Sequence, residues 1–282
     1  MKWLLQDRPI PHERIPLYNR FYLHASKASL VDPVLVWGTE IEAEPLQAFL
    51  RARNRGGRVI LTTAHALIRA TGLALAQFPD MNVRVVGRRV FAFRDIGVRM
   101  GFVHRGSNEI DLLLVSGADR KSLEEIGGEV WQRLLQAGRG KGPRDRDLKR
   151  LRRVPAFWFR QVLRIFGFLD RHWRLPIVGR LDELRGGAAM VNDLSFPGAP
   201  PMRSYKPTRF PSASDTLNLT LGPVESKVVA RGDQFVSVGV MPLFVRADHR
   251  LVDAYQLGRF TAAVRDLLNH PERLDAEPGE TT

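Results

Sequence analysis

Hydrophobic and polar positions follow two different periods along this chain. Apolar residues that recur every three to four positions predict helices at about residues 44–53, 61–77, 122–137 and 253–268. Short apolar or alternating runs predict strands, at 34–37, 39–42, 83–86, 90–93, 98–103, 109–115, 188–191, 217–221, 226–230, 235–240 and 243–247. Helices and strands in irregular alternation favour a mixed α/β fold, of the α+β two-layer kind, with one long insertion.

One predicted helix also carries a start signal. Ser122 and Glu125 stand three residues apart at its beginning, which is the spacing of a capping box. The Ser oxygen then accepts a backbone N–H of the first turn, and the Glu reaches back to the cap.

Composition narrows the class of protein. The chain has 282 residues and no Cys, and a length of this order suits a single domain over 1–282. Without Cys there are no disulfides, thiolate metal sites, iron–sulfur clusters or cysteine nucleophile. This fits a reducing, cytoplasmic location. The N-terminal residues lack a long apolar core, and no run reaches the roughly 18 apolar residues of a membrane span, so we expect neither a secretory signal nor a spanning helix.

Positive charge gathers in one stretch. The chain has a formal charge of +13, and residues 139–185 hold fourteen Lys or Arg against five Asp or Glu, a net +9. Such a field attracts an anionic partner. No nucleic-acid-binding module accompanies it, so nucleic acid is a disfavoured partner.

Within this basic insertion, residues 150–174 form an amphipathic helical pattern. Arg160, Arg164 and Arg171 share one predicted face, and the other side is apolar. An apolar face edged by Arg and flanked by Trp158 and Trp173 is typical of a helix at a membrane surface. The alternative is a helix docked on its own core or on a hydrophobic protein partner, with the Arg side solvated.

The segment 247–254 carries the most chemistry. It reads Ala-Asp-His-Arg-Leu-Val-Asp-Ala, with His249 at its centre. Acyl transfer needs a group that removes a proton from the attacking thiol or hydroxyl, and imidazole, with an ordinary pKa of about 6.5, can take and return that proton near neutral pH. The segment resembles the Asp-His-Arg-x-x-Asp-Gly signature of the dihydrolipoamide acyltransferase catalytic domains of 2-oxoacid dehydrogenase complexes, whose fold chloramphenicol acetyltransferase shares.

Further blocks extend the resemblance in the same order along most of the chain. They are residues 61–70, 78–82, 95–98, 118–123 and 186–198. The lipoyl and peripheral-subunit-binding domains of the complex enzymes have no counterpart in this sequence, so we expect no covalent lipoyl group.

The resemblance implies a function and a site. It implies a chloramphenicol acetyltransferase-like fold, coenzyme A (as acyl-CoA) as co-substrate, and a homotrimer or higher assembly in which the two substrates enter a channel from opposite ends. His249 is then the general base at the trimer interface. Asp253 holds the loop by pairing with an Arg, for which Arg14 and Arg20 are candidates, and Arg250 supports the same turn.

Several positions depart from the family pattern. Ala254 replaces a Gly, which predicts an altered turn. Asn192 aligns with the Ser that stabilises the oxyanion, and Met190 with its paired Thr. An Asn amide can still donate to an oxyanion. The enzyme hypothesis, with catalytic residues His249, Asp253 and Asn192, therefore stands beside a second one: a catalytically lapsed homologue that serves as a trimeric scaffold or membrane-peripheral assembly partner.

Other candidate chemistry is weak. His65 and His104 have no evident partner in the sequence and are expected to be packing or surface residues. No Gly-x-Ser-x-Gly elbow supports a serine hydrolase, and neither a Gly-rich phosphate loop nor a His-Glu-x-x-His metal motif is present. We therefore expect no metal.

Overall fold

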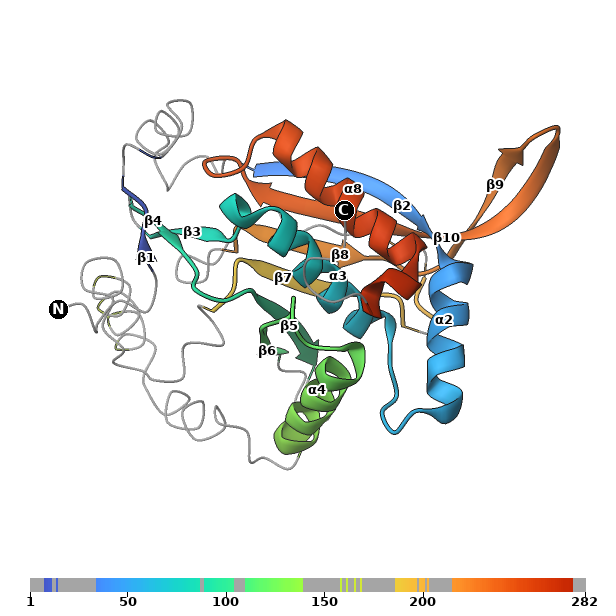
Figure 1. Cartoon of the computed structure of the whole chain (residues 1–282), viewed down its shortest axis with the longest axis horizontal. Helices are drawn as coiled ribbons and strands as arrows, with labels where there is room; N and C mark the ends of the chain where they lie inside the picture. Colours follow the sequence, from blue (N-terminus) through green and yellow to red (C-terminus); the bar gives the residue numbers. More distant parts are fainter. Residues whose placement is uncertain are drawn as a thin grey trace.

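The main body of the protein is a mixed sheet covered by helices on one face (Figure 1). The computed structural model describes residues 8–11, 14, 34–86, 89–103, 110–138, 158, 161, 165, 168, 186–196, 198–200, 202 and 215–275. Within these residues a seven-stranded sheet has the order β2-β10-β8-β7-β5-β6, and β9 pairs with β10. The pairs β5–β7 and β7–β8 are parallel and the others are antiparallel.

Strands of the large sheet, four long helices and a small second sheet make up the described part of the chain. The strands of this sheet are β2 (Val34–Glu42), β5 (Gly97–Val103), β6 (Ile110–Ser116), β7 (Ala189–Asp193), β8 (Leu217–Leu221), β9 (Glu225–Arg231) and β10 (Gln234–Asp248). The helices are α2 (Ala43–Gly56), α3 (Thr63–Gln77), α4 (Leu123–Gly138) and α8 (Ala254–Asn269), with 3-10 turns η3 (Pro79–Met81) and η4 (Pro271–Asp275). A small second sheet joins β1 (Arg8–Pro9), β4 (Arg89–Ala92) and β3 (Val83–Val86).

The two faces of the large sheet differ in chemistry. On β8, Leu217, Leu219 and Leu221 belong to the hydrophobic core, whereas Asn218 and Thr220 alternate with them and face the other side. Core side chains from the neighbouring strands line the same face as the leucines, and α3 and α8 lie across it (Figure 1). The opposite face therefore carries the polar positions of the sheet.

Helix α3 is the centre of the core. Every residue from Ala64 to Leu75 is buried, because other elements surround this helix. Gly72 makes the tightest approach, since a Cβ at this position would lie 2.5 Å from the backbone carbonyl carbon of Ala118. Only glycine allows the helix to lie this close to the turn that follows β6.

Most of the elements expected from periodicity are confirmed, and so is the capping box. The Ser122 amide donates to Glu125 Oε2 at 2.8 Å, and the Glu125 amide donates to Ser122 Oγ at 3.2 Å.

One expectation was wrong. The strands predicted at 235–240 and 243–247 are a single strand, β10, which continues through Pro242. The carbonyl oxygen of Pro242 points towards β8 and accepts a hydrogen bond from the Gly222 amide, which lies just beyond the last paired residue of β8. The ladder between β8 and β10 therefore needs no hydrogen bond from the nitrogen of Pro242, which carries no hydrogen.

The basic insertion lies almost wholly outside the described residues. Only Trp158, Gln161, Ile165 and Phe168 are described there, and all four are helical. Trp158, Ile165 and Phe168 are more than half exposed. In the part of the chain that the structure describes, no helix is both long enough and apolar enough to cross a membrane.

Candidate active site

His249 occupies the turn between β10 and α8. Its ring is half-buried, and Nδ1 lies 3.0 Å from the carbonyl oxygen of Val252. A carbonyl can only accept, so Nδ1 carries the hydrogen of the neutral ring and Nε2 carries the lone pair. The turn thus selects the tautomer in which Nε2 can act as a base.

A buried ion pair holds this turn in shape. The guanidinium of Arg250 binds the Asp248 carboxylate in a bidentate manner, with Nε 2.8 Å from Oδ1, and the Arg250 amide donates to the same oxygen. Both side chains are at most 5% exposed. The two residues on either side of His249 are therefore locked together, which supports the expected role of Arg250.

Asp253 caps helix α8. Its Oδ1 accepts from the Gln256 amide at 2.7 Å, while Gln256 Oε1 accepts from the Asp253 amide at 3.1 Å. This reciprocal cap satisfies first-turn donors and fixes where the helix begins. The pairing expected with Arg14 is not present in the single chain, and Arg20 lies outside the described residues. Ala254 is the exposed first residue of the helix, so the turn accommodates its methyl group.

Asn192 lies on β7, on the polar side of the sheet. Its Nδ2 donates to Asn218 Oδ1 on β8 at 3.1 Å. Longer contacts, of 3.4 and 3.5 Å, lead from the same nitrogen to the Leu219 carbonyl and Thr220 Oγ1. One N–H is thus committed to Asn218, and the second is only weakly engaged.

The strand register keeps His249 and Asn192 apart within one chain. Asp248, which precedes the histidine, hydrogen-bonds through its amide to Thr216, whereas Asn192 pairs with Thr220. Four residues along the strands and two strand spacings across them give a backbone separation of about 16 Å from Asp248 to Asn192. His249 lies beyond Asp248. A single chain therefore does not bring the two candidate residues to one reacting atom.

Buried arginines lie in the row of residues next to Asn192. The register aligns Arg99, Met190, Asn218 and Arg246 across four strands, and both arginines are about 1% exposed. Arg99 pairs with the buried Asp215. Burial, and to a smaller degree the nearby Arg84, lowers the pKa of Arg99 to about 10. It remains a cation at neutral pH, so this side of the sheet favours developing negative charge.

A hydroxyl–carboxylate cluster that was not predicted from the sequence lies where β7 meets α3. Thr63 Oγ1 donates to Asp193, and Ser195 Oγ lies 2.5 Å from the other carboxylate oxygen and 2.8 Å from Thr63 Oγ1. The cluster fixes the chain directly after Asn192. Thr63 is 130 residues or more from the other two members in sequence, so no local motif predicts the cluster.

His65 is also more than a packing residue. Its Nδ1 accepts from the Thr62 amide at 2.9 Å and closes a capping box at the start of α3. Burial lowers the pKa of this imidazole to about 4, and Asp193 opposes the shift. The sequence signal was the three-residue spacing from Thr62, with His in the place usually taken by Glu or Gln.

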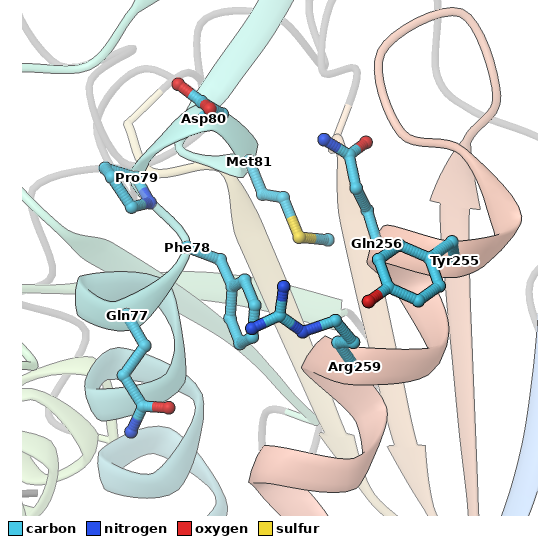
Figure 2. Close-up of a pocket in the computed structure, with 8 residues that line it drawn as sticks. All are labelled: Gln77, Phe78, Pro79, Asp80, Met81, Tyr255, Gln256 and Arg259. Atoms are coloured by element: carbon cyan, nitrogen blue, oxygen red, sulfur yellow. The ribbon is translucent and has the colours of Figure 1, made fainter. Parts of the chain in front are cut away.

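A small pocket of about 180 Å³ lies between the end of α3 and the start of α8. Figure 2 shows Arg259 reaching between Phe78 and Tyr255, and its guanidinium carbon is 5.4 and 5.7 Å from the two ring centroids. This volume is below the roughly 300–1,000 Å³ of most ligand pockets. The pocket is too small for coenzyme A, so this pocket of a single chain is not a coenzyme A site.

The fold defines the class of protein. The chain superposes on a solved chloramphenicol acetyltransferase with a TM-score of 0.51 and 13% identity, covering 93% of this chain and 99% of that one. A helix-covered mixed sheet with a histidine turn after a long strand therefore has the chloramphenicol acetyltransferase-like fold that the sequence predicted.

Sequence comparisons then show which family the chain resembles. Residues 215–275 match the family model of the 2-oxoacid dehydrogenases acyltransferase (catalytic domain). The lipoamide acyltransferase component of the branched-chain alpha-keto acid dehydrogenase complex of Pseudomonas aeruginosa is 25% identical over 240 residues, which are 85% of this chain. These findings confirm the resemblance of this chain to the 2-oxoacid dehydrogenase acyltransferase catalytic domain. It spans 46% of the length of that curated relative.

Two further solved structures share the fold. A dihydrolipoamide acetyltransferase of Azotobacter vinelandii, studied for the role of a serine, a histidine and an asparagine in its mechanism, has a TM-score of 0.65, 18% identity and coverage of 94% and 92%. The cubic core of a pyruvate dehydrogenase multienzyme complex also has a TM-score of 0.65, with 17% identity and 94% of each chain covered.

Proposed function

We propose that the chain is a coenzyme A-dependent acyltransferase, with His249 as general base and a thiol, hydroxyl or amine as the acyl acceptor. The observation that carries the proposal is the hydrogen bond from Nδ1 of His249 to the Val252 carbonyl, because it leaves Nε2 as the basic nitrogen. Asp253 and the Asp248–Arg250 pair hold the turn that sets this orientation.

Each group then has a defined task. Nε2 of His249 takes the proton of the attacking acceptor as it adds to the acyl carbonyl of the thioester. Asn192 donates its weakly engaged N–H to the oxygen that becomes negative, and Arg99 and Arg246 favour that charge from the neighbouring row. When the carbon–sulfur bond breaks, His249 returns the proton to the departing sulfur, so that coenzyme A leaves as the thiol.

The site proposed here is shared between copies of the chain. The separation of about 16 Å between Asp248 and Asn192 prevents both groups from acting on one carbonyl within a single copy. A homotrimer or higher assembly removes this difficulty, because His249 of one copy can face Asn192 of the next. A channel between copies also provides the volume that the pocket near Arg259 lacks.

Complementation between two inactive variants tests the proposal. We expect His249→Ala to lower acceptor-dependent release of coenzyme A by about 100-fold or more, and Asn192→Ala by a similar factor. If the two variants are co-expressed in equal amounts, about one quarter of the sites combine an intact His with an intact Asn, so activity returns to about one quarter. Equal amounts of the separately assembled variants are the control. Unchanged turnover in His249→Ala would remove this histidine from the mechanism.

The alternative is a catalytically lapsed homologue that acts as a scaffold. The motivation is Asn192, whose amide already donates to Asn218 and stands where the family has a serine. Calorimetric titration with coenzyme A discriminates between the two functions. Binding that His249→Ala leaves intact, together with turnover that it abolishes, supports the enzyme, whereas an absence of binding supports the scaffold.

A membrane-peripheral location is a separate proposal. It is supported by Trp158, Ile165 and Phe168, which are helical and exposed at spacings of seven and three residues, within the most basic part of the chain. Flotation with vesicles of phosphatidylserine and phosphatidylcholine tests it. We expect binding that falls as salt is raised, and the triple variant with Ser at these three positions should lose it.

A further inference from the structure

The pocket of about 180 Å³ beside Arg259 has a lining that the proposed reaction does not use. Phe78, Pro79 and Met81 line it from the end of α3 and from η3, while Tyr255 and Arg259 line it from α8. Figure 2 shows the Met81 side chain extending into the space between η3 and α8. A water molecule occupies about 30 Å³ in the liquid, so the pocket has the volume of roughly six waters and suits a compound of few heavy atoms.

The guanidinium of Arg259 is held between two aromatic rings at this pocket. Its Cζ atom lies 5.4 Å from the ring centroid of Phe78 and 5.7 Å from that of Tyr255. Such cation–π contacts orient the flat guanidinium without using a carboxylate or a carbonyl oxygen as acceptor. The N–H groups of this arginine are therefore available to a ligand.

Arg259 has no acidic partner in the part of the chain that the structure describes. Asp80 lines the same pocket but forms no ion pair with this arginine. Figure 2 shows Asp80 at the other end of the pocket, with its carboxylate directed away from Arg259. A cation that is oriented by its neighbours but not neutralised by them favours an anionic ligand.

Gln256 adds a second donor to the lining. Its Oε1 accepts from the Asp253 amide at 3.1 Å, which holds the side-chain oxygen at the start of α8. Among the described residues the Nε2 group of Gln256 has no hydrogen-bond partner, and the residue lines the pocket. The polar part of the lining on α8 thus consists of donors, which match an acceptor such as a carboxylate.

The charges of the lining decide the class of anion. Arg259 and Asp80 together carry no net charge, so a doubly charged phosphate would have one cation to bind and one carboxylate to repel it. A carboxylate carries a single charge, and its two oxygens match the N–H groups at one edge of a guanidinium. The side chains of Phe78, Pro79 and Met81 suit a short hydrocarbon body behind that carboxylate.

We infer that this pocket binds the anion of a small monocarboxylic acid, with the carboxylate on Arg259 and a short apolar chain against Phe78 and Met81. A free acid is the favoured occupant because the hollow is small and has its own apolar wall for the hydrocarbon part. The inference goes beyond the proposed function and does not depend on it, since neither His249 nor Asn192 lines the pocket.

Methyl NMR of Met81 measures the binding directly. The chain has six Met residues, so labelling their methyl groups with carbon-13 gives a small set of resonances, and Met81→Leu assigns the one that matters. Butyrate is the probe, titrated at constant pH and ionic strength. We expect the Met81 resonance to move in a saturable manner while the others stay, with a millimolar dissociation constant, because a ligand of few heavy atoms gains little binding free energy.

A neutral ligand of the same size is the first control. Butyramide lacks the charge of butyrate and should bind about 10-fold more weakly or worse. N-acetylglutamate amide is the second control, since it carries the same short carboxylate on a peptide backbone. It should also bind more weakly than butyrate, because the pocket has no room for the backbone.

Matched arginine variants locate the carboxylate. Arg259→Gln and Arg265→Gln each remove one positive charge from exposed positions of α8, and Arg265 does not line the pocket. Arg259→Gln should raise the dissociation constant of butyrate by about 10-fold or more, and Arg265→Gln should leave it unchanged. Unaltered circular dichroism in both variants shows that the fold is retained.

Four results would overturn the inference. The first three are a Met81 resonance that does not move at butyrate concentrations well above the millimolar range, butyramide that binds as tightly as butyrate, and equal loss of affinity in the two arginine variants. The fourth is tighter binding of N-acetylglutamate amide, which would identify an acidic protein segment as the occupant. None of these measurements uses turnover, so a failure of the proposed function would leave their outcome unchanged.

Discussion

Asn192 donates to Asn218 across the β7–β8 pair, with 3.1 Å between Nδ2 and Oδ1. Asn218 is about 1% exposed, and among the residues that the structure describes its own Nδ2 has no hydrogen-bond partner. A buried amide hydrogen without a partner lowers stability. The asparagine at this position is therefore better explained by its side-chain oxygen, which accepts from Asn192. It fixes the direction of the Asn192 amide, and we assign Asn218 as a positioning residue of the proposed site.

Replacing Asn218 by Leu should therefore lower kcat by about 10-fold with little change in KM, because a misdirected oxyanion donor acts mainly in the transition state. The fold should be retained, since the change removes an unpaired polar group. In the Asn192→Ser background the same replacement should have a smaller effect, which steady-state kinetics of the four proteins can measure. Equal losses in both backgrounds would contradict the positioning role.

Replacing Asp253 by Ala should destabilise the protein by about 1 kcal/mol, because the cap on the Gln256 amide is lost. Asp253→Asn should be almost neutral, since asparagine is an equally good cap. Urea unfolding of the two variants measures the difference. A loss in Asp253→Asn as large as that in Asp253→Ala would show that the charge, and not the cap, is what matters.

The buried His65 should make stability depend on pH. Its folded pKa of about 4 lies below the unfolded value of 6.5, so the unfolded chain binds the extra proton first. Stability from this group is therefore fully present above pH 6.5 and is lost as the pH falls towards 4, by on the order of 3 kcal/mol.

His65→Gln keeps a side-chain acceptor for the Thr62 amide but does not titrate in this window. The difference in unfolding free energy between the two proteins should shrink by that amount between pH 7 and pH 4. Carboxylates common to both proteins cancel in this comparison. A constant difference across the range would contradict a buried neutral imidazole.

Gly72→Ala should destabilise the protein by about 1–3 kcal/mol, because the new methyl group would meet the Ala118 backbone. Gly128→Ala in α4 is the control, since nothing lies within 4 Å of a Cβ there. It should be neutral or stabilising by up to about 1 kcal/mol. Thermal unfolding of both variants tests whether close packing, and not helix propensity, requires glycine at position 72.

The sequence predicted the regular elements well because their signals are local. Helix α3 and strand β8 follow directly from apolar spacing and lie within two residues of the expected bounds. The strand break predicted near Pro242 is absent, because whether a proline breaks a strand depends on where the neighbouring strand ends. That information is in the register and not in the local sequence.

The candidate site was predictable only in part. The turn at His249 is one short segment, so its motif could be found directly. The cluster of Thr63, Asp193 and Ser195 joins distant segments, and the separation of His249 from Asn192 depends on the pairing of three strands. Periodicity and spacing do not encode such relationships.

Strand β10 connects the exposed Phe235 to the turn that carries His249. It is one uninterrupted strand of 15 residues, about 50 Å long, with Phe235 near its first residue and His249 directly after its last. The number of residues between the aromatic ring and the imidazole is therefore a structural constant of the molecule. Deleting one of them would turn the ring to the other side of the strand, and deleting two would shift the ring by nearly 7 Å relative to the histidine turn.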